Sequence, residues 1–221
     1  ADPEAIKVVK EKLKSYGKDV ILVNENFRYL ESICNRQGFR PVNGILFDLG
    51  MSSLQLETPG RGFSFQQDPP PDMRFRPRQL LSAADIVNTY PERELALILE
   101  KYGEEWRAQQ IARCIVERRP LRTTTELAHV VEDAVGGVRG RIHPATKAFQ
   151  ALRIAVNQEL ESLEIALGQA LNLLGSGGRI VVISFHSLED RLVKGFLRRE
   201  SQGCICPPST PVCTCGHTPK L

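Results

Sequence analysis

The stretch that decides the fold class is residues 177–185, which reads GGRIVVISF. A short apolar run that follows a pair of glycines predicts a buried β-strand. A second run of this kind, GILFDLG at residues 44–50, ends in Asp48 and a glycine turn. Residues 158–174 carry an amphipathic helical pattern directly before the later strand. Helices that alternate with buried strands are typical of a parallel α/β sheet, so we expect both runs to belong to one sheet.

The first residues of the chain show the same alternation. Asp2 and Pro3 are a typical helix start, and apolar residues recur at helical spacing until Gly17. Residues 19–23 predict a short strand, and residues 27–35 predict another helix.

A long segment of different character separates the two buried strands. Residues 59–77 are rich in Pro, Gly and Arg and predict an ordered crossover, whereas residues 82–118 and 124–135 have helical periodicity. We therefore expect an all-helical domain inserted into an α/β core. The expected parts are the first part of the core at 1–75, the helical insertion at 76–150, the return of the core at 151–200 and a Cys-rich tail at 201–221.

Composition excludes several classes of protein. The 221 residues are 42% hydrophobic and 25% charged, as in ordinary globular proteins, which argues against a disordered or fibrous chain. The longest aliphatic run is far shorter than the ~20 residues that span a bilayer. The sequence does not start with the basic and then apolar pattern of a signal peptide. We expect a cytoplasmic protein without a membrane helix.

Basic side chains gather in residues 105–153, although the net charge is only +3. This segment has nine basic residues against five acidic ones, and eight of the nine are arginines. Arginine suits phosphate because its guanidinium makes bidentate hydrogen bonds. Arg118, Arg119 and Arg122 are therefore candidate contacts to a polyanion, and a solvated helix face is the alternative.

Four cysteines lie within twelve residues of the tail: Cys204, Cys206, Cys213 and Cys215. In a cytosolic context such a group favours a metal, zinc in the first place, over disulfides. The Cys-x-Cys spacing is tighter than in common zinc fingers, and free redox-labile thiols are the alternative.

Polar residues follow both buried strands, where open parallel sheets bind their ligands. Asp48, Ser52 and Ser53 offer a carboxylate and two hydroxyls after the first strand. The simpler interpretation is that Asp48 caps its own turn. The stretch SFHSLEDR at residues 184–191 follows the second strand, and for His186 alone a structural hydrogen bond is the simpler role.

Longer motifs carry a resemblance to a known family. They are RGFSF at 61–65, DMR at 72–74, HPAT at 143–146, FQALRIAVN at 149–157 and the stretch at 184–191. In this order, over practically the whole chain, they resemble the ribosomal RNA small subunit methyltransferase H family, also called MraW.

The resemblance implies a methyltransferase-type Rossmann core, interrupted by a helical domain. It also implies S-adenosylmethionine-dependent methylation of the N4 amine of a cytidine in small-subunit (16S) ribosomal RNA, free or in the assembled subunit. Phe27, Asp48 and Gln55 match cofactor-contacting positions of the family. Its other cofactor motifs would precede Ala1, so we expect a chain truncated at both ends that lacks part of the cofactor site.

Such a reaction needs hydrogen-bond acceptors for a weakly nucleophilic amine, held in line with the methyl donor. Asp48, Ser52 and Ser53 are the expected catalytic acceptors. The base must leave its stack, and Phe63, Phe65 and Arg74 are candidates to hold it, although both Phe residues also suit a core. His143 has a candidate RNA-binding role and a structural alternative at a helix start. The rival functions are a non-catalytic RNA-binding or ribosome-assembly module and methylation of DNA bases.

Overall fold

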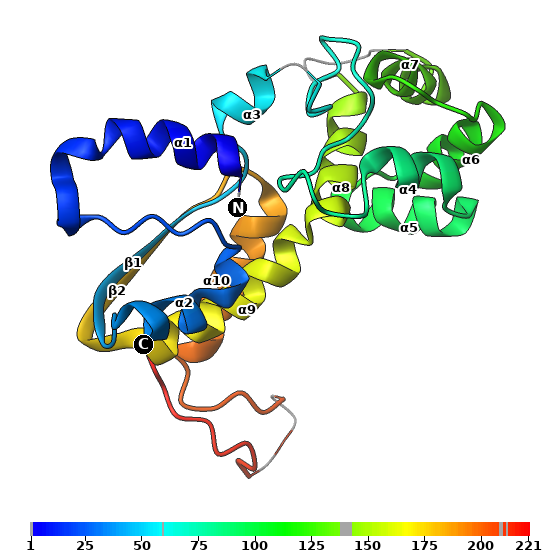
Figure 1. Ribbon diagram of the computed structural model, residues 1–221. Coiled ribbons are helices and arrows are strands. Elements are labelled where there is room, and N and C mark those ends of the chain that lie inside the picture. Colours follow the sequence, from blue (N-terminus) through cyan, green and yellow to red (C-terminus); the bar gives the residue numbers. More distant parts are fainter. Residues whose placement is uncertain (1, 59, 138–142, 208–209, 211) are drawn as a thin grey trace. The chain divides into compact units, whose positions relative to one another are not determined.

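The computed structural model describes residues 2–58, 60–137, 143–207, 210 and 212–221 (Figure 1). The chain forms two compact units, and each is described by itself. Unit 1 contains residues 1–24 and 51–159, and unit 2 contains residues 25–50 and 160–221. The expected boundaries after residues 75, 150 and 200 stay predictions.

Unit 2 has a mixed α/β fold around a parallel pair of strands. Its elements are η2 (Phe27–Tyr29), α2 (Leu30–Gln37), β1 (Val42–Asp48), α9 (Glu159–Leu173, of which all but the first residue belongs to this unit), β2 (Leu174–Ile183) and α10 (Ser187–Glu200). β1 and β2 pair in parallel, with Ile45 opposite Ile180 and Asp48 opposite Ile183. The two runs expected to share one parallel sheet therefore do so, and the α/β class is confirmed.

One face of the β1–β2 pair is the core of unit 2. Phe47 of β1 packs with Leu163 and Leu167 of α9 and with Val193 and Phe196 of α10. These side chains are buried, because β1 and the amphipathic helices α9 and α10 each direct one apolar face inward.

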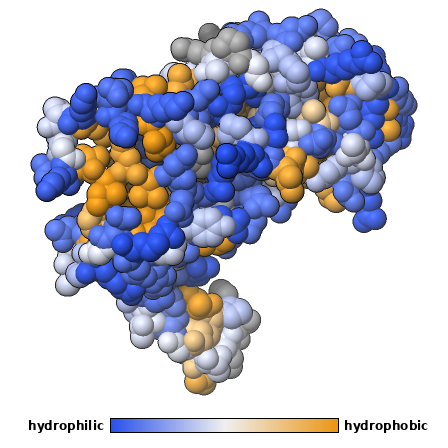
Figure 2. All heavy atoms as spheres, in the orientation of Figure 1, coloured by the Kyte–Doolittle hydropathy of each residue, from blue (hydrophilic) through white to orange (hydrophobic). Residues whose placement is uncertain are grey.

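The opposite face of the same strands is apolar and exposed. Leu46, Val181 and Ile183 alternate with the core residues, and Leu46 is 63% exposed. Figure 2 shows apolar residues gathered over β1 and β2. Unit 2 thus buries its sheet on one side only, whereas strands of parallel sheets are ordinarily covered on both.

The regular elements that the structure describes in unit 1 are helices. Its elements are α1 (Pro3–Lys12), η1 (Lys14–Asp19), α3 (Ser53–Glu57), α4 (Ala83–Thr89), α5 (Glu92–Gly103), α6 (Ala108–Glu117), α7 (Thr124–Ala134) and α8 (Ala145–Asn157). Leu95, Leu99, Ile111, Ile115 and Leu152 from α5, α6 and α8 are fully buried in one core. The expected helices of the insertion are therefore confirmed.

Residues 60–82 have neither helix nor strand, as expected for a crossover. Gly62 has φ +71°, and an added Cβ would lie 2.4 Å from the backbone nitrogen of Asp72. Only glycine tolerates both the conformation and this close approach. Phe63 is buried and stacks on Phe75 at 5.7 Å between ring centroids, and Phe65 packs edge-on against Phe149 at 5.1 Å. Both candidate base-holding Phe residues thus contribute to the packing of unit 1.

One element was predicted wrongly. Residues 19–23 were expected to form a strand, but Asp19 ends η1 and residues 20–23 have no strand partner. An apolar run becomes a strand only where a neighbouring strand supplies hydrogen bonds. Among the helices that the structure describes, none is both long enough and apolar enough to cross a bilayer.

Candidate functional site

Asp48 lies where β1 delivers the chain into a loop. Its carboxylate is exposed, and it makes no hydrogen bond or ion pair with the residues that the structure describes. The simpler expectation was that Asp48 caps its own turn, but its side chain makes no hydrogen bond to that turn. The backbone nitrogen of Leu49 donates to the carbonyl of Ile183 at 3.1 Å, which fixes the turn to the end of β2. The turn thus places a carboxylate that has no bonded partner among the described residues at the carboxyl end of the parallel strands.

Gly50 completes this turn. Its φ of +82° is in the left-handed region that glycine adopts most readily. A Cβ added there would lie 3.4 Å from the ring of Phe185, which follows β2. The two strand-end loops of unit 2 therefore lie side by side, and glycine keeps the space between them open.

Phe27 begins η2 on the same unit. Its ring lies edge-on to that of Phe47, with 6.1 Å between the ring centroids, and the residue is 37% exposed. One side of Phe27 is thus anchored on the core through Phe47, while part of the ring is accessible to a ligand.

His186 has a structural role at the start of α10. Its Nδ1 atom accepts a hydrogen bond from the backbone nitrogen of Glu189 at 3.3 Å, and its Nε2 atom lies 3.3 Å from the Glu189 carboxylate. The same carboxylate accepts from the backbone nitrogen of Phe185 at 3.0 Å. Glu189 is buried, so it holds the loop after β2 in one conformation.

Ser52, Ser53 and Gln55 belong to unit 1 and build the start of α3. Ser52 is the N-cap, and its hydroxyl accepts from the backbone nitrogen of Gln55 at 3.3 Å. The Gln55 side-chain oxygen accepts in return from the backbone nitrogen of Ser52 at 3.1 Å. This is a capping box, in which two otherwise unpaired donors are satisfied. Ser53 is exposed in the first turn of α3.

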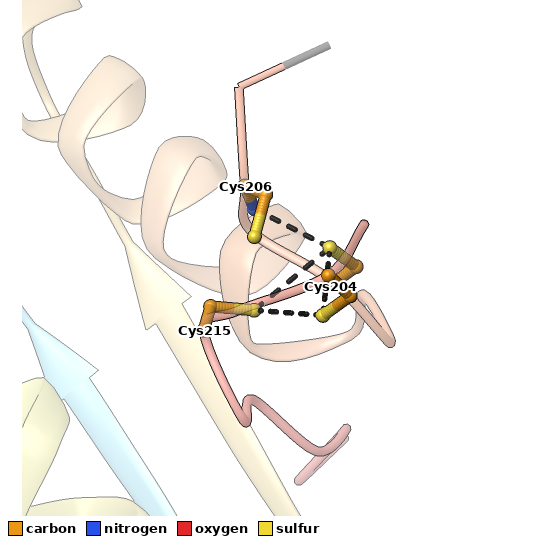
Figure 3. A group of neighbouring side chains, drawn as sticks. Cys204, Cys206 and Cys215 are labelled. Carbon is orange, nitrogen blue, oxygen red and sulfur yellow. Dashed lines mark hydrogen bonds between the residues drawn. The ribbon is translucent and has the colours of Figure 1, made fainter. Parts of the chain in front are cut away.

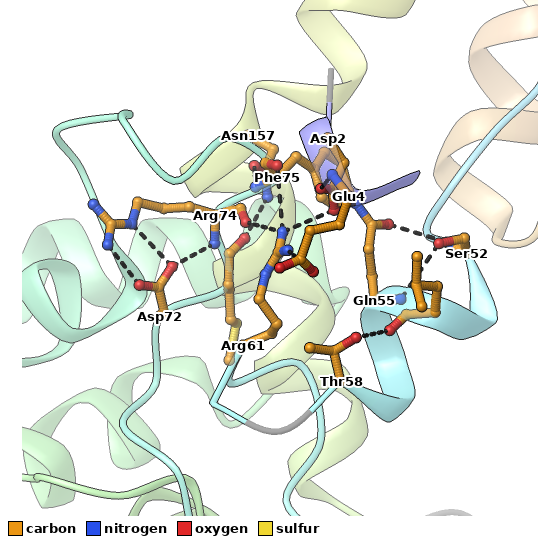
Figure 4. A network of polar contacts seen from close by, with 12 residues as sticks. Asp2, Glu4, Ser52, Gln55, Thr58, Arg61, Asp72, Arg74, Phe75 and Asn157 are labelled. Carbon is orange, nitrogen blue, oxygen red and sulfur yellow. Dashed lines mark hydrogen bonds and ion pairs between the residues drawn. The ribbon is translucent and has the colours of Figure 1, made fainter. Parts of the chain in front are cut away.

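A buried polar network continues from Gln55 (Figure 4). The Gln55 side-chain amide donates to Asp2 at 3.0 Å, and the Arg61 guanidinium lies 3.0 Å from the same carboxylate oxygen. Asp2 is only 4% exposed. Burial opposes its ionisation, but the hydrogen bonds from Gln55, the backbone of Glu4 and Arg61 outweigh that effect and lower the pKa of Asp2.

The sequence showed Asp2 only as a helix cap, a role that is confirmed because its side chain accepts from the backbone nitrogen of Glu4. The role of Arg61 as its partner was missed. The two residues are 59 positions apart, and no local pattern connects them. A buried carboxylate needs a cationic or hydrogen-bonding partner, but the sequence does not say which one.

Arg74 bonds to other residues of the crossover. Its guanidinium forms a two-pronged ion pair with Asp72 at 2.6 and 2.9 Å and donates to the carbonyl of Gln79 at 2.7 Å. The Asp72 carboxylate raises the pKa of Arg74. Asn157 fixes the same crossover to α8, since its amide bonds the backbone of Met73 and Phe75 at 2.8 Å. Contact of Arg74 with RNA stays a prediction.

The three candidate phosphate-binding arginines differ in their surroundings. Arg118 pairs with Asp133 at 2.6 Å. Arg119 donates to the carbonyls of Val87 and Tyr90, each at 2.6 Å. Arg122 is exposed, and within the described residues its guanidinium has no bonded partner. Arg122 is thus the best placed of the three to meet an external phosphate.

These differences predict opposite phenotypes for two similar substitutions. Arg122→Gln should reduce the slope of log RNA affinity against log salt by about 0.7–0.9 and leave the free energy of unfolding unchanged. Arg119→Gln should lower the free energy of unfolding by about 2 kcal/mol, because it removes charged donors from the carbonyls at the end of α4. Salt-dependent binding and denaturant melts of both variants check this. If Arg122→Gln leaves the slope unchanged, this arginine belongs to a solvated surface.

His143 caps the start of α8. Its Nδ1 atom accepts from the backbone nitrogen of Ala145 at 3.2 Å, and its ring packs at a tilt against that of Phe65, with 4.8 Å between the ring centroids. Its Nε2 atom is 3.6 Å from the carboxylate of Glu132. These contacts give His143 a local structural role, and binding of RNA stays a prediction.

The cysteine cluster lies after α10 in unit 2, and its four sulfur atoms all lie within 4.8 Å of one another. Backbone N–H groups of His217 and Ile205 lower the pKa of the Cys215 thiol to about 6. Cys34 and Cys114 stand apart; Cys34 is buried and Cys114 half-buried.

The features of unit 2 define a class of protein. A parallel strand pair, a glycine turn and a carboxylate at the carboxyl ends of the strands are typical of α/β proteins that bind a small ligand at that edge. Comparison with known proteins narrows the class. The model of the MraW methylase family matches residues 1–221, and the chain belongs to this family. The mixed α/β fold with its parallel sheet is consistent with a Rossmann-like methyltransferase.

Curated relatives share one name. "Ribosomal RNA small subunit methyltransferase H" of Dehalococcoides mccartyi is 60% identical over 221 residues, which are 100% of this chain and 63% of that protein. The proteins of the same name from Thermomicrobium roseum and Carboxydothermus hydrogenoformans are 55% and 51% identical, and the chain covers 69% and 72% of them. The chain thus spans 63% of the length of its relative from D. mccartyi.

Proposed function

We propose that this protein transfers a methyl group from S-adenosylmethionine to the N4 amine of a cytidine in small-subunit ribosomal RNA. The observation that carries the proposal is the family match over the whole chain, together with relatives named ribosomal RNA small subunit methyltransferase H. The choice of the N4 amine rests on the motif resemblance.

The residues at the end of β1 suit this chemistry. S-adenosylmethionine, when bound, supplies an electrophilic methyl group on a sulfonium. The exposed Asp48 carboxylate can accept an N–H hydrogen of the amine and orient its lone pair, and positioning of this kind is a large part of catalysis. Gly50 lets the backbone approach a ligand closely, and the accessible part of Phe27 provides an apolar wall.

The proposal gives a less direct role in methyl transfer to three residues at the start of α3: Ser52, Ser53 and Gln55. Both ends of the Gln55 amide are bonded, to Ser52 and to Asp2, so Gln55 acts first through the conformation of α3. The Ser53 hydroxyl is exposed and remains available as an acceptor. The zinc expected at the cysteine cluster is not needed for this reaction, because a sulfonium donates its methyl group without a metal.

The test, on a protein that spans the full length of these relatives, is transfer of labelled methyl groups from S-adenosylmethionine to four substrates: small-subunit RNA, the assembled small subunit, large-subunit RNA and duplex DNA. We expect label in small-subunit RNA, free or assembled, and N4-methylcytidine after digestion to nucleosides. Label on DNA alone would replace the proposal with a DNA methyltransferase. RNA binding without any transfer would favour a non-catalytic ribosome-assembly module.

A further inference from the structure

The tail beyond α10 contains the most concentrated group of soft ligands in the described residues. Figure 3 shows the sulfur atoms converging from two short segments. Cys204 and Cys206 lie on the first segment, and Cys213 and Cys215 on the second. In both pairs one residue separates the cysteines, so each segment contributes two thiols to the same point.

The distances between these sulfurs match a tetrahedral metal site. Cys213 Sγ lies 3.5 Å from the sulfurs of both Cys204 and Cys215. The sulfurs of Cys204 and Cys215 are 3.8 Å apart. A zinc ion bonds each thiolate at about 2.3 Å, so the edge of its sulfur tetrahedron is about 3.8 Å. A disulfide needs a separation of about 2.05 Å, and no pair of these cysteines is bonded.

Backbone donors surround the cluster as well. The nitrogen of Cys206 donates to Cys204 Sγ, and the nitrogen of Thr214 donates to Cys206 Sγ, each at 3.4 Å. N–H groups directed at sulfur stabilise the thiolate over the thiol. In metal sites such outer contacts orient the ligands and spread their negative charge.

We propose that Cys204, Cys206, Cys213 and Cys215 bind one zinc ion. Four thiolates in a tetrahedron select zinc or iron among the common metals. Zinc is redox-inert and is the usual ion of closed four-cysteine structural sites. In the bound state all four cysteines are thiolates, the protons that the thiols still carry pass to the buffer, and the site has a net charge of 2−. With all four positions taken by protein, the ion has a structural role.

The ion connects two parts of unit 2. Downstream of Cys215, the tail returns to the end of α10, where the backbone nitrogen of Lys220 donates to the carbonyl of Glu200 at 2.8 Å. His217 Nε2 lies 3.0 Å from the carbonyl of Arg199, so this imidazole caps the helix and does not complete the sulfur cluster. Among the residues of the tail that the structure describes, none belongs to a buried apolar core, and metal coordination supplies the free energy that orders the tail.

Metal analysis of protein purified without chelator tests the proposal. We expect about one equivalent of zinc, release of that zinc on titration with a mercurial reagent, and its loss in the four single Cys→Ser variants of the cluster. Cobalt(II) in place of zinc should give the visible absorption of tetrahedral thiolate coordination. Cys114→Ser is the matched control, because this half-buried cysteine is outside the cluster, and it should keep the full metal content and the cobalt spectrum.

Hydrogen exchange of the Lys220 amide tests the connection to α10. Chelation should increase the exchange rate of this amide at least about tenfold, while the amides of α9 keep their protection. Three results would overturn the proposal: zinc far below one equivalent in zinc-supplemented buffer, a metal content that the cluster variants do not change, or a mass that shows disulfides. One equivalent of iron would overturn the choice of zinc.

Discussion

We expect Asp48→Ala to reduce methyl transfer about a hundred-fold or more while the protein stays folded. The carboxylate is exposed at the end of β1 and has no bonded partner within the described part of the chain, so its removal costs no native interaction there. Loss of one positioning group in an active site typically reduces the rate by this factor. The measurement is the initial rate of labelled methyl transfer to small-subunit RNA, with a thermal melt of the same sample.

Asp19→Ala is the matched control for this substitution. Asp19 is also an exposed carboxylate at the end of an element, η1, but it is distant from either strand in sequence. This variant should keep the wild-type rate. Wild-type turnover by a folded Asp48→Ala protein would remove Asp48 from the proposed mechanism and leave the family assignment untouched.

The second large effect is on stability. Arg61→Ala should lower the free energy of unfolding by about 3–5 kcal/mol, because it leaves the buried Asp2 carboxylate without its cation. The guanidinium also donates to the backbone carbonyls of Arg74 and Phe75, at 3.0 and 3.3 Å. These bonds hold the crossover together, and the ion pair with Asp2 connects it to α1. Urea denaturation of wild-type and variant protein measures the difference.

Arg113→Ala provides the comparison. Arg113 also faces a carboxylate, that of Glu92 at 3.8 Å, but the pair is exposed and should contribute less than about 1 kcal/mol. Equal losses of unfolding free energy in the Arg61→Ala and Arg113→Ala variants would contradict the expectation that the buried ion pair contributes more to stability than the exposed one.

The pH dependence of stability follows from the lowered pKa of Asp2. A carboxyl whose pKa is lower in the folded state stabilises the protein above its unfolded pKa, about 3.9. That contribution is lost as the pH falls through the folded pKa. The stability difference between wild type and Asp2→Asn should therefore be full at pH 7 and shrink below about pH 4.

Local patterns in the sequence were enough to predict most elements. The apolar runs at 44–47 and, after two glycines, at 179–183 predicted two strands that indeed pair. The start of the first helix was also readable, since Asp2 caps α1 as expected. An apolar run and a helix cap are local features, which a single sequence contains. The wrongly predicted strand at 19–23 shows the limit, because a strand depends on a partner elsewhere in the chain.

The roles of the charged residues could not be predicted from local patterns in this way. Arg74, Arg119 and Arg122 were all candidates for contact with RNA, but the first two are bonded to protein groups and the third is exposed. An arginine side chain is long, and the partner it meets is set by which distant backbone carbonyl or carboxylate the fold brings near. The composition of the chain and the spacing of its residues therefore do not show which group an arginine side chain bonds.

The sequence by itself determined the family, the parallel α/β class, the helices within residues 82–135 and the presence of four cysteines close together in the tail. Each depends on residue identity, periodicity or spacing, which are properties of the linear chain. Only the tertiary structure decided that Asp2 is buried against Arg61, that Gln55 is bonded to Ser52 and Asp2, and that the four sulfurs lie within 4.8 Å of one another. These facts depend on long-range packing, because burial and hydrogen-bond partners exist only once distant segments come together.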